Sequence, residues 1–294
     1  MGKLLIDYNQ IILANIHVGL GKYGDEITFD MIRHLFLYNL KTLKTKFGKD
    51  YSEVILCCDG SYSWRRKEFP YYKYKRRESR ADSPLDWNMI FDSIVRLRDE
   101  LAEYFPYRVI HLEAAEGDDC IAVISKYLQT NELEQYGLDV ETQKVMIVSS
   151  DHDYIQLQVW PNIDQYSSIQ KKFVRRNDPQ EFLLEHIIKA GDDGIPNIYS
   201  DDDTYATGKR SVTMTAKRVE EARQAILTDT MTDDFRRNYK RNKMLIDLMN
   251  EIPDYVSDEI IKQYKEQSNK SRSKMMDYFI KNKLKNLMDD ISKF

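Results

Sequence analysis

Residues 144–154 read KVMIVSSDHDY, an apolar run followed by two serines and then by Asp151 and Asp153. A short apolar run that ends in acids predicts a buried parallel strand, which delivers carboxylates to the carboxyl-terminal edge of a sheet. Open α/β sheets bind their ligands at this edge. The stretch therefore predicts an α/β fold and also the place of its functional site.

Other acidic groups stand in a similar position, after an apolar run or at the start of a helical pattern. They are Asp7, Asp59, the acids of residues 116–119 and the acids of residues 192–193. Carboxylates that converge on one edge raise each other's pKa unless cations neutralise them. Divalent cations such as Mg²⁺ prefer oxygen ligands. The pattern thus indicates a metal-dependent site, and the lack of an HExxH motif or a Cys/His cluster disfavours zinc.

Each acidic group also has a purely structural interpretation. Asp151 can cap the following helix, and acids in the first turn at 116–119 suit the helix dipole. Asp7 and Asp59 can each cap the end of the strand that precedes them. Two acids after paired serines, and three acids in four positions, exceed what caps and dipoles need. We therefore interpret these residues as metal ligands, and the acidic run at 201–203 as a solvated loop or a helix cap outside the site.

Strand-like runs alternate with helical periodicity in the first part of the chain, which predicts a mostly parallel sheet flanked by helices. The strands are expected at 3–7, 53–59, 108–112 and 144–150, with a weaker one at 163–168, and the helices at 29–46, 88–105 and 118–128. Beyond these the pattern is helical, at 179–190, 213–228, 233–250, 256–267 and 272–292. We predict an α/β core at 1–178 and an all-helical subdomain at 179–294.

The composition is that of a globular protein, with 294 residues, 31% charged residues and a net charge of −4. No apolar stretch has transmembrane or signal-peptide length, so we expect a cytoplasmic protein with no membrane partner. The cysteines Cys57, Cys58 and Cys120 form no CxxC pair, and we expect reduced thiols in the core.

Residues 60–88 form a basic segment, with eight basic and two acidic residues between Arg65 and Arg80. The segment is too polar for a core and is expected to be a mobile excursion from the sheet edge. A solvated surface helix is the structural alternative. Interleaved aromatic residues suit stacking on unpaired bases: Trp64, Phe69, Tyr71, Tyr72 and Tyr74. A basic segment beside an acidic pocket suits a polyanion that is bound at its backbone and then cut.

Three motifs together resemble those of the flap endonuclease / 5′→3′ exonuclease superfamily. They are Glu116-Gly117-Asp118-Asp119, Ser149-Ser150-Asp151-His152-Asp153 and Asp193-Gly194-Ile195-Pro196-Asn197. The opening Leu5-Ile6-Asp7 and the Cys-Asp…Trp-Arg-Arg segment at 58–66 are most similar to the T-even-type branch of phage ribonucleases H. The resemblance covers nearly the whole chain. It implies a PIN-like nuclease core with a basic arch at 60–88, followed by a helix–turn–helix subdomain that binds duplex.

The resemblance also implies a role for each matched residue. Two Mg²⁺ ions, replaceable by Mn²⁺, would be held by a first set, Asp7, Asp59, Glu116, Asp118 and Asp151, and a second set, Asp119, Asp153 and Asp193. The basic arch would place Lys73 and Arg76 near the scissile phosphate, with Arg65 as a further catalytic candidate. Nucleic-acid contacts would come from Arg66, Lys75, Arg77, Tyr72, Gly191 and Gly194, with a K⁺ ion at the helix–turn–helix.

One departure from the superfamily pattern lies in the turn at 190–193. Superfamily members carry two Asp residues three apart there, whereas this turn is shorter by about one residue. Asp193 aligns through the Gly-Ile-Pro that follows it, and the sequence does not decide whether Asp192 replaces the other acid.

The function implied is a 5′-nuclease that acts on RNA–DNA hybrid and on 5′ ends or flaps of duplex DNA. Such an enzyme removes primers in phage DNA replication in the host cytoplasm, with a single-stranded-DNA-binding protein as partner of the helical half. Three alternatives stay open. A PIN-type ribonuclease lacks the helical half, and a phosphatase needs an Asp-x-Asp motif that Asp7-Tyr8-Asn9 does not supply. A non-catalytic duplex-binding protein would keep the helical half and tolerate the altered turn.

Overall fold

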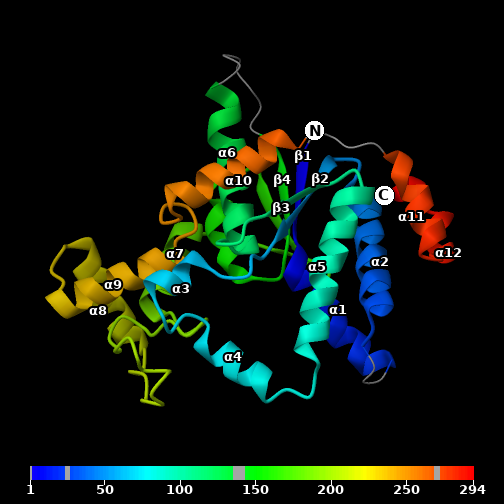
Figure 1. Cartoon of the computed structure of the whole chain (residues 1–294). Helices are drawn as coiled ribbons and strands as arrows, with labels where there is room; N and C mark the ends of the chain where they lie inside the picture. Colours follow the sequence, from blue (N-terminus) through cyan, green and yellow to red (C-terminus); the bar gives the residue numbers. More distant parts are fainter. Residues whose placement is uncertain (1, 24–26, 135–142, 268–271) are drawn as a thin grey trace.

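The computed structural model describes residues 2–23, 27–134, 143–267 and 272–294. At its centre is a six-stranded sheet in the order β3-β2-β1-β4-β5-β6 (Figure 1). The strands are β1 (Gly2–Asp7), β2 (Tyr51–Cys58), β3 (Arg108–His111), β4 (Val145–Val148), β5 (Ile163–Ser167) and β6 (Lys172–Val174). Strands β1 to β5 are parallel, and β6 is antiparallel to β5. The predicted mostly parallel sheet is confirmed.

Strand β1 lies in the middle of the sheet because its apolar residues are buried on both faces. Leu5 pairs with Ile55 of β2 on one side and with Ile147 of β4 on the other. The chain adds β2 and β3 on one side of β1 and then β4 and β5 on the other. The carboxyl ends of β2, β1 and β4 therefore lie side by side at the switch point, where open α/β sheets place their sites.

Helices cover both faces of the sheet. One face packs on α1 (Tyr8–Tyr23), α2 (Phe29–Phe47) and α5 (Trp87–Tyr104), and the other on α6 (Gly117–Glu134), η1 (His152–Val159) and α10 (Asp254–Glu266). Helix α1 lies outside the ranges where we expected helices. It begins directly at Tyr8, whose buried ring packs edge-on against Phe36.

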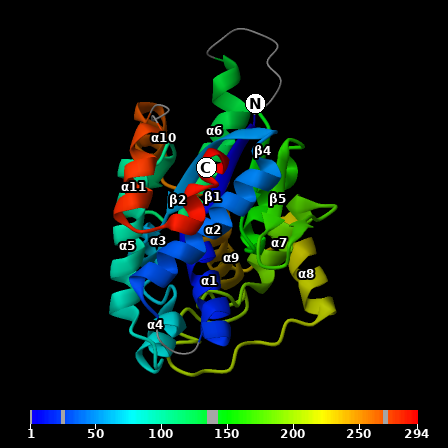
Figure 2. The same ribbon diagram turned by 90° about the vertical axis from the view of Figure 1, so that its right-hand side faces the viewer.

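The helices beyond residue 178 divide into two groups. In both views α8 (Ala216–Leu227) lies on the opposite side of the molecule from α11 (Met275–Lys281) (Figure 1, Figure 2). Helices α7 (Pro179–Lys189), α8 and α9 (Asp233–Ile246) pack together beside the sheet edge. Helices α10, α11 and α12 (Lys285–Met288) return to the sheet and complete its two cores.

The single helix expected at 272–292 is broken. Helix α11 ends at Lys281, and Lys283 has a left-handed φ of 54°. The chain then turns back, so that the fully buried ring of Phe294 contacts Phe105 and Phe279. The Tyr107 hydroxyl donates a hydrogen bond to the Phe294 carbonyl at 3.0 Å. The end of the chain is thus part of the core on the α5 side.

The expectation of a mobile excursion at 60–88 is wrong for the first half of that segment. The whole segment contains α3 (Trp64–Glu68) and α4 (Tyr74–Ala81). In its first half, the side chains of Trp64, Phe69 and Tyr72 are buried. Phe69 and Tyr72 pack in a cluster with residues of α7 and α9, which the local sequence does not reveal. Only α4, which has no buried residue, extends beyond the sheet edge (Figure 1).

Two further expectations concern composition. The three cysteines are buried and unbridged, as predicted. In the described part of the chain, no helix combines the length and the apolar character that a membrane span requires.

Removal of the Phe294 ring tests the packing of the chain end. We expect Phe294→Ala to lower the free energy of unfolding by about 3 kcal/mol, because a fully buried aromatic ring leaves a cavity. Urea denaturation measures this value. Lys293→Ala, which removes only an exposed side chain paired with Asp290, is the control and should change little. Equal stability of the two variants would contradict the role of the chain end in the core.

Candidate active site

The end of β1 places Asp7 at the centre of the site. One of its carboxylate oxygens accepts hydrogen bonds from the Ser149 hydroxyl at 2.9 Å and the Tyr154 hydroxyl at 3.1 Å. Burial, together with the nearby charges of Asp59 and Asp151, raises the pKa of Asp7 to about 7. Sequence reasoning missed Tyr154, whose hydroxyl reaches Asp7 from η1. In the sequence, Tyr154 is not distinguished from the apolar residues that follow it.

The acids after β2 and β4 lie beside Asp7. Asp59 accepts a hydrogen bond from the Gly117 amide at 2.8 Å, and burial raises its pKa although Lys73 and this amide oppose the shift. Asp151 accepts a hydrogen bond from the Asp153 amide at 3.0 Å and so caps η1, which was the structural interpretation of this residue. Its side chain is nevertheless exposed at the edge, so capping and ligand binding are compatible.

Glu116 is where the basic arch meets the acids. One oxygen of its carboxylate pairs with the Lys73 ammonium, and the other accepts hydrogen bonds from Tyr72 at 2.8 Å and Arg65 at 3.2 Å. Burial acts to raise the pKa of Glu116, but Lys73 and Arg65 outweigh it and lower the pKa to about 2. Asp118, the second residue of α6, shows the opposite result, because burial raises its pKa more than Arg65 lowers it.

Arg65, a catalytic candidate, and Asp119, a candidate metal ligand, both have partners within the protein. Arg65 is 1% exposed, and its guanidinium donates to Asp119 at 2.8 Å, to Glu116 and to the Leu245 carbonyl at 2.9 Å. Asp119 is 0% exposed and also accepts hydrogen bonds from the Trp64 indole at 3.1 Å and from the Glu116 amide at 3.0 Å. Both groups are therefore fully engaged within the protein, and they position Glu116 instead of facing a substrate.

The turn after α7 packs against residues 71–74 of the basic arch, which we call its base. The Asp193 carboxylate pairs with Arg76 at 2.5 Å and lies 3.5 Å from the Lys73 ammonium, and its carbonyl accepts a hydrogen bond from the Lys73 amide at 2.6 Å. Gly194 has a φ of 78°, and a Cβ there would lie 2.9 Å from the Tyr71 carbonyl. Glycine is thus required for this close approach.

Two of the residues predicted to contact nucleic acid have partners within the protein. The Gly191 amide donates to the Ile195 carbonyl at 2.8 Å, so it does not point to a phosphate. Tyr72 is buried, and its hydroxyl is bound to Glu116, so its ring does not stack on a base as the structure stands. By contrast, Arg66, Lys75 and Arg77 are exposed on α3 and α4, and the described residues offer none of them a carboxylate within ion-pair distance.

A groove leads away from the acids along α7. Asp151, Asp153, Asp192 and His186 line its first part, of about 380 Å³. Burial and the charges of Asp151 and Asp193 raise the pKa of Asp153 to about 8, and the His186 imidazole lies 3.4 Å from its carboxylate. No motif in the sequence pointed to His186.

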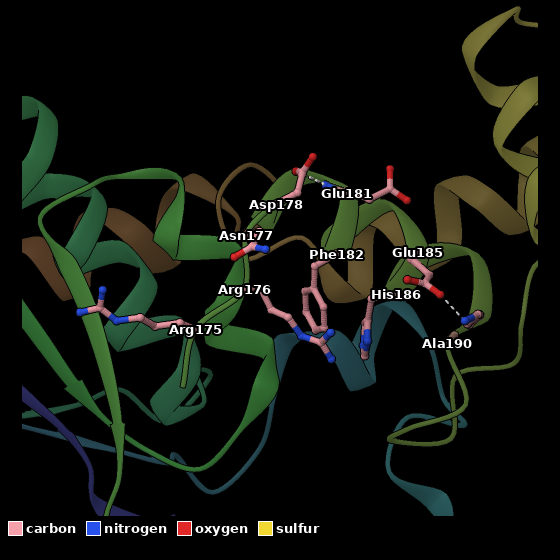
Figure 3. Close-up of a pocket in the computed structure, with 10 residues that line it drawn as sticks. Arg175, Arg176, Asn177, Asp178, Glu181, Phe182, Glu185, His186 and Ala190 are labelled. Carbon is pink, nitrogen blue, oxygen red and sulfur yellow. Dashed lines mark hydrogen bonds and ion pairs between the residues drawn. The ribbon is translucent and has the colours of Figure 1, made fainter. Parts of the chain in front are cut away.

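The groove continues into a wider part of about 590 Å³ (Figure 3). There the Phe182 ring stacks on His186 at 5.8 Å, and Arg176 extends toward Phe182. The acidic site thus opens onto a surface that carries an aromatic ring and side chains of both charges, which sequence reasoning did not foresee.

The donors fit hard divalent cations in their chemistry. The described residues contain no group of three His, Cys, Asp or Glu side chains with metal-binding spacing as they stand. Lys73 and Arg65 hold Glu116, and Arg76 holds Asp193, so these two acids pair with cations of the protein itself. On the β1 side, however, the raised pKa values of Asp7, Asp59, Asp118 and Asp153 mark acids without sufficient positive charge. Divalent ions supply the positive charge that such a set lacks.

Known proteins of two kinds share this fold. Phage T5 5′-exonuclease with bound zinc has a TM-score of 0.64 and 16% identity, covering 90% of this chain and 99% of its own. Phage T5 D15 flap endonuclease, in a complex with DNA and metal ions, has a TM-score of 0.60 and 13% identity, covering 90% of this chain and 100% of its own. Ribonuclease H of Enterobacteria phage T4 is 33% identical over 311 aligned positions, covering 100% of this chain and 96% of that protein.

Two family models match successive parts of the chain. Residues 5–186 match the family described as 5′-3′ exonuclease, N-terminal resolvase-like domain. Residues 179–294 match the family described as T4 RNase H, C terminal. The first match holds the acidic edge and the basic arch, and the second holds α7 to α12. From these matches and the full-length likeness to the T4 protein, this chain belongs to the 5′→3′ exonuclease family, in its T4 ribonuclease H branch.

Proposed function

We propose that the protein is a divalent-metal-dependent 5′-nuclease that cleaves RNA–DNA hybrid and the 5′ ends or flaps of duplex DNA. Its role would be to remove RNA primers during phage DNA replication in the host cytoplasm. One observation carries the proposal. Lys73 and Arg76 of the basic arch reach Glu116 and Asp193 at the edge where Asp7 and Asp59 meet. This brings phosphate-binding cations together with metal-binding acids.

The metal ions would be held by the acids that the structure leaves at the edge. A first set consists of Asp7, Asp59, Glu116, Asp118 and Asp151, and a second set of Asp153 and Asp193, with Asp192 beside them in the groove. Mg²⁺ is the expected ion and Mn²⁺ a substitute, because both prefer carboxylate and water oxygens. When bound, such ions activate a water nucleophile and stabilise the leaving oxygen of a phosphodiester.

The protein's own residues bind and orient the nucleic acid. Lys73 and Arg76 add positive charge where charge builds on the phosphoryl oxygens in the transition state. Tyr72 and Arg65 fix the Glu116 carboxylate between the basic arch and α6. The unpaired cations on α3 and α4 would bind the backbone of the strand independently of sequence.

The helical half supports a duplex substrate. Its match to the T4-type C-terminal domain argues against a small PIN-type ribonuclease, which lacks such a half. We propose that the turn at 191–200 and the groove along α7 bind the duplex, and that a single-stranded-DNA-binding protein docks on the same half of the chain.

Cleavage by Asp118→Asn tests the metal assignment. We expect Mg²⁺-dependent cutting of 5′-labelled flap and RNA–DNA hybrid substrates by the wild type, and a loss of at least about 100-fold in the variant, because a neutral amide binds a hard cation weakly. Asp99→Asn, at an exposed acid of α5, is the control and should cut normally. Full activity of Asp118→Asn would show that the ions bind elsewhere, and an inactive wild type would remove the nuclease proposal.

Lys73→Ala separates catalysis from binding. We expect turnover on the hybrid to fall by about 100-fold, while the Kd for the hybrid rises less than about threefold, because the ammonium acts mainly on the transition-state charge. Single-turnover cleavage and fluorescence anisotropy measure the two values. Lys262→Ala removes an exposed lysine of α10, which pairs with Glu259 away from the arch, and serves as the matched control. A loss of affinity with unchanged turnover would reduce Lys73 to a phosphate contact.

A further inference from the structure

Helix α9 presents a polar face to the interior. Asn238, Arg241 and Asn242 stand at positions i, i+3 and i+4, so they lie on one side of the helix. All three are buried, and Arg241 is only 8% exposed. A buried helix face is ordinarily apolar, and a buried charge is stable only with partners. This face must therefore be matched by polar groups opposite it.

The matching groups are backbone carbonyls of the turn at 191–200. The Arg241 guanidinium donates to the Pro196 carbonyl at 2.8 Å, to the Asn197 carbonyl at 3.3 Å and to the Ser200 carbonyl at 3.5 Å. It also pairs with the Asp202 carboxylate. The side chains of Asn242 and Asn238 donate to the carbonyls of Pro196 and Ile198 at 3.0 Å and 2.9 Å.

Other carbonyls of this turn accept hydrogen bonds from the backbone. The Asp192 carbonyl accepts from Ile195, the Asp193 carbonyl from Lys73 and the Ile195 carbonyl from Gly191. A K⁺ ion at the helix–turn–helix, which the resemblance to the superfamily implies, needs several carbonyl oxygens turned toward it. Those of Pro196, Asn197 and Ser200 are turned toward the guanidinium instead. The turn therefore does not fit the expected potassium site.

We propose that Arg241 is a built-in cation that shapes the 191–200 turn for duplex binding, so that the protein binds duplex without potassium. The guanidinium neutralises the same carbonyl dipoles that a bound monovalent ion would neutralise, and it is fixed by its covalent link to α9. The part of the proposal that concerns duplex rests on the proposed function. Arg241 is a positioning residue, since its donors face the turn and not a substrate.

The position of the turn gives Arg241 a second effect. The same turn carries Asp193, which pairs with Arg76 and lies 3.5 Å from the Lys73 ammonium. Gly194 of the turn approaches the Tyr71 carbonyl at the base of the basic arch. A turn held by Arg241 thus fixes Asp193 relative to the arch as well as the surface that meets the duplex.

Cation exchange in the absence of nucleic acid is the first test. Thermal unfolding of the wild-type chain is measured in KCl and in LiCl at equal concentration. We expect the same Tm in both salts, because the carbonyls are already occupied by Arg241. A Tm that is specifically higher in KCl would show a potassium site in the turn and would overturn the proposal. This test needs no variant, so it stands even if substitutions at Arg241 prevent folding.

Duplex binding is the second test. The wild type should bind duplex with the same Kd in both salts, whereas a tenfold preference for KCl would overturn the proposal. Arg241→Met should raise the duplex Kd by about tenfold at a temperature where the variant is folded, because buried carbonyls lose a charged donor. Binding of a single-stranded oligonucleotide, which the arch would contact, should change less than about twofold. An equal loss for both ligands would reduce Arg241 to a general structural role.

Arg236→Met is the matched control, because Arg236 lies on the same helix but pairs with Asp229 outside the turn. It should bind duplex as the wild type does, and equal affinities of the Arg236 and Arg241 variants would contradict the inference. If the wild type binds no duplex or hybrid in either salt, the proposed function is wrong, while the unfolding comparison still decides whether Arg241 replaces potassium.

Discussion

The site depends on the hydrogen bonds and ion pairs of the buried Arg65 guanidinium. This guanidinium contacts Asp119 and Glu116 at the start of α6 and the Leu245 carbonyl near the end of α9, and it belongs to the first helix of the basic arch. A buried charge that loses a partner is strongly destabilising, so the three segments are stable only when they are assembled together. The acidic edge, the arch and the helical half therefore form one unit.

The acids at the edge differ in how well they are neutralised. Lys73 and Arg65 reach Glu116 and lower its pKa to about 2, whereas Asp7 has neutral hydrogen-bond donors, from two hydroxyls and the Gln10 amide, and a pKa raised to about 7. The edge is thus neutralised on the arch side and short of positive charge around β1. This gradient explains why the donor chemistry suits divalent ions although, in the described residues, no three of these side chains are arranged to hold an ion.

The sequence was sufficient for features that depend on local periodicity. Apolar runs predicted strands β1 to β5, and the acids that follow β1, β2 and β4 meet because parallel strands end at one edge. Burial of the first half of the arch could not be predicted, because it depends on a contact between Arg65 and a carbonyl 180 residues away. Charge counts made Arg65 look like a surface residue, and an acidic motif made Asp119 look like a ligand. Neither pattern indicates which charges pair with each other.

Two buried arginines organise the two surfaces that we propose to bind nucleic acid, and these surfaces touch. Arg65 holds the arch to α6 and α9, and Arg241 holds the turn. Lys73 joins the two, because its backbone amide donates a hydrogen bond to the Asp193 carbonyl and its ammonium lies near the carboxylates of Glu116 and Asp193. Because Glu116 and Asp193 share the Lys73 ammonium, a displacement of the turn changes the charge around Glu116 as well. In the complex that we propose, contact of a duplex with the turn would therefore be coupled to the acidic edge through Lys73 and through the Tyr72 hydroxyl, which lies within hydrogen-bond distance of both carboxylates.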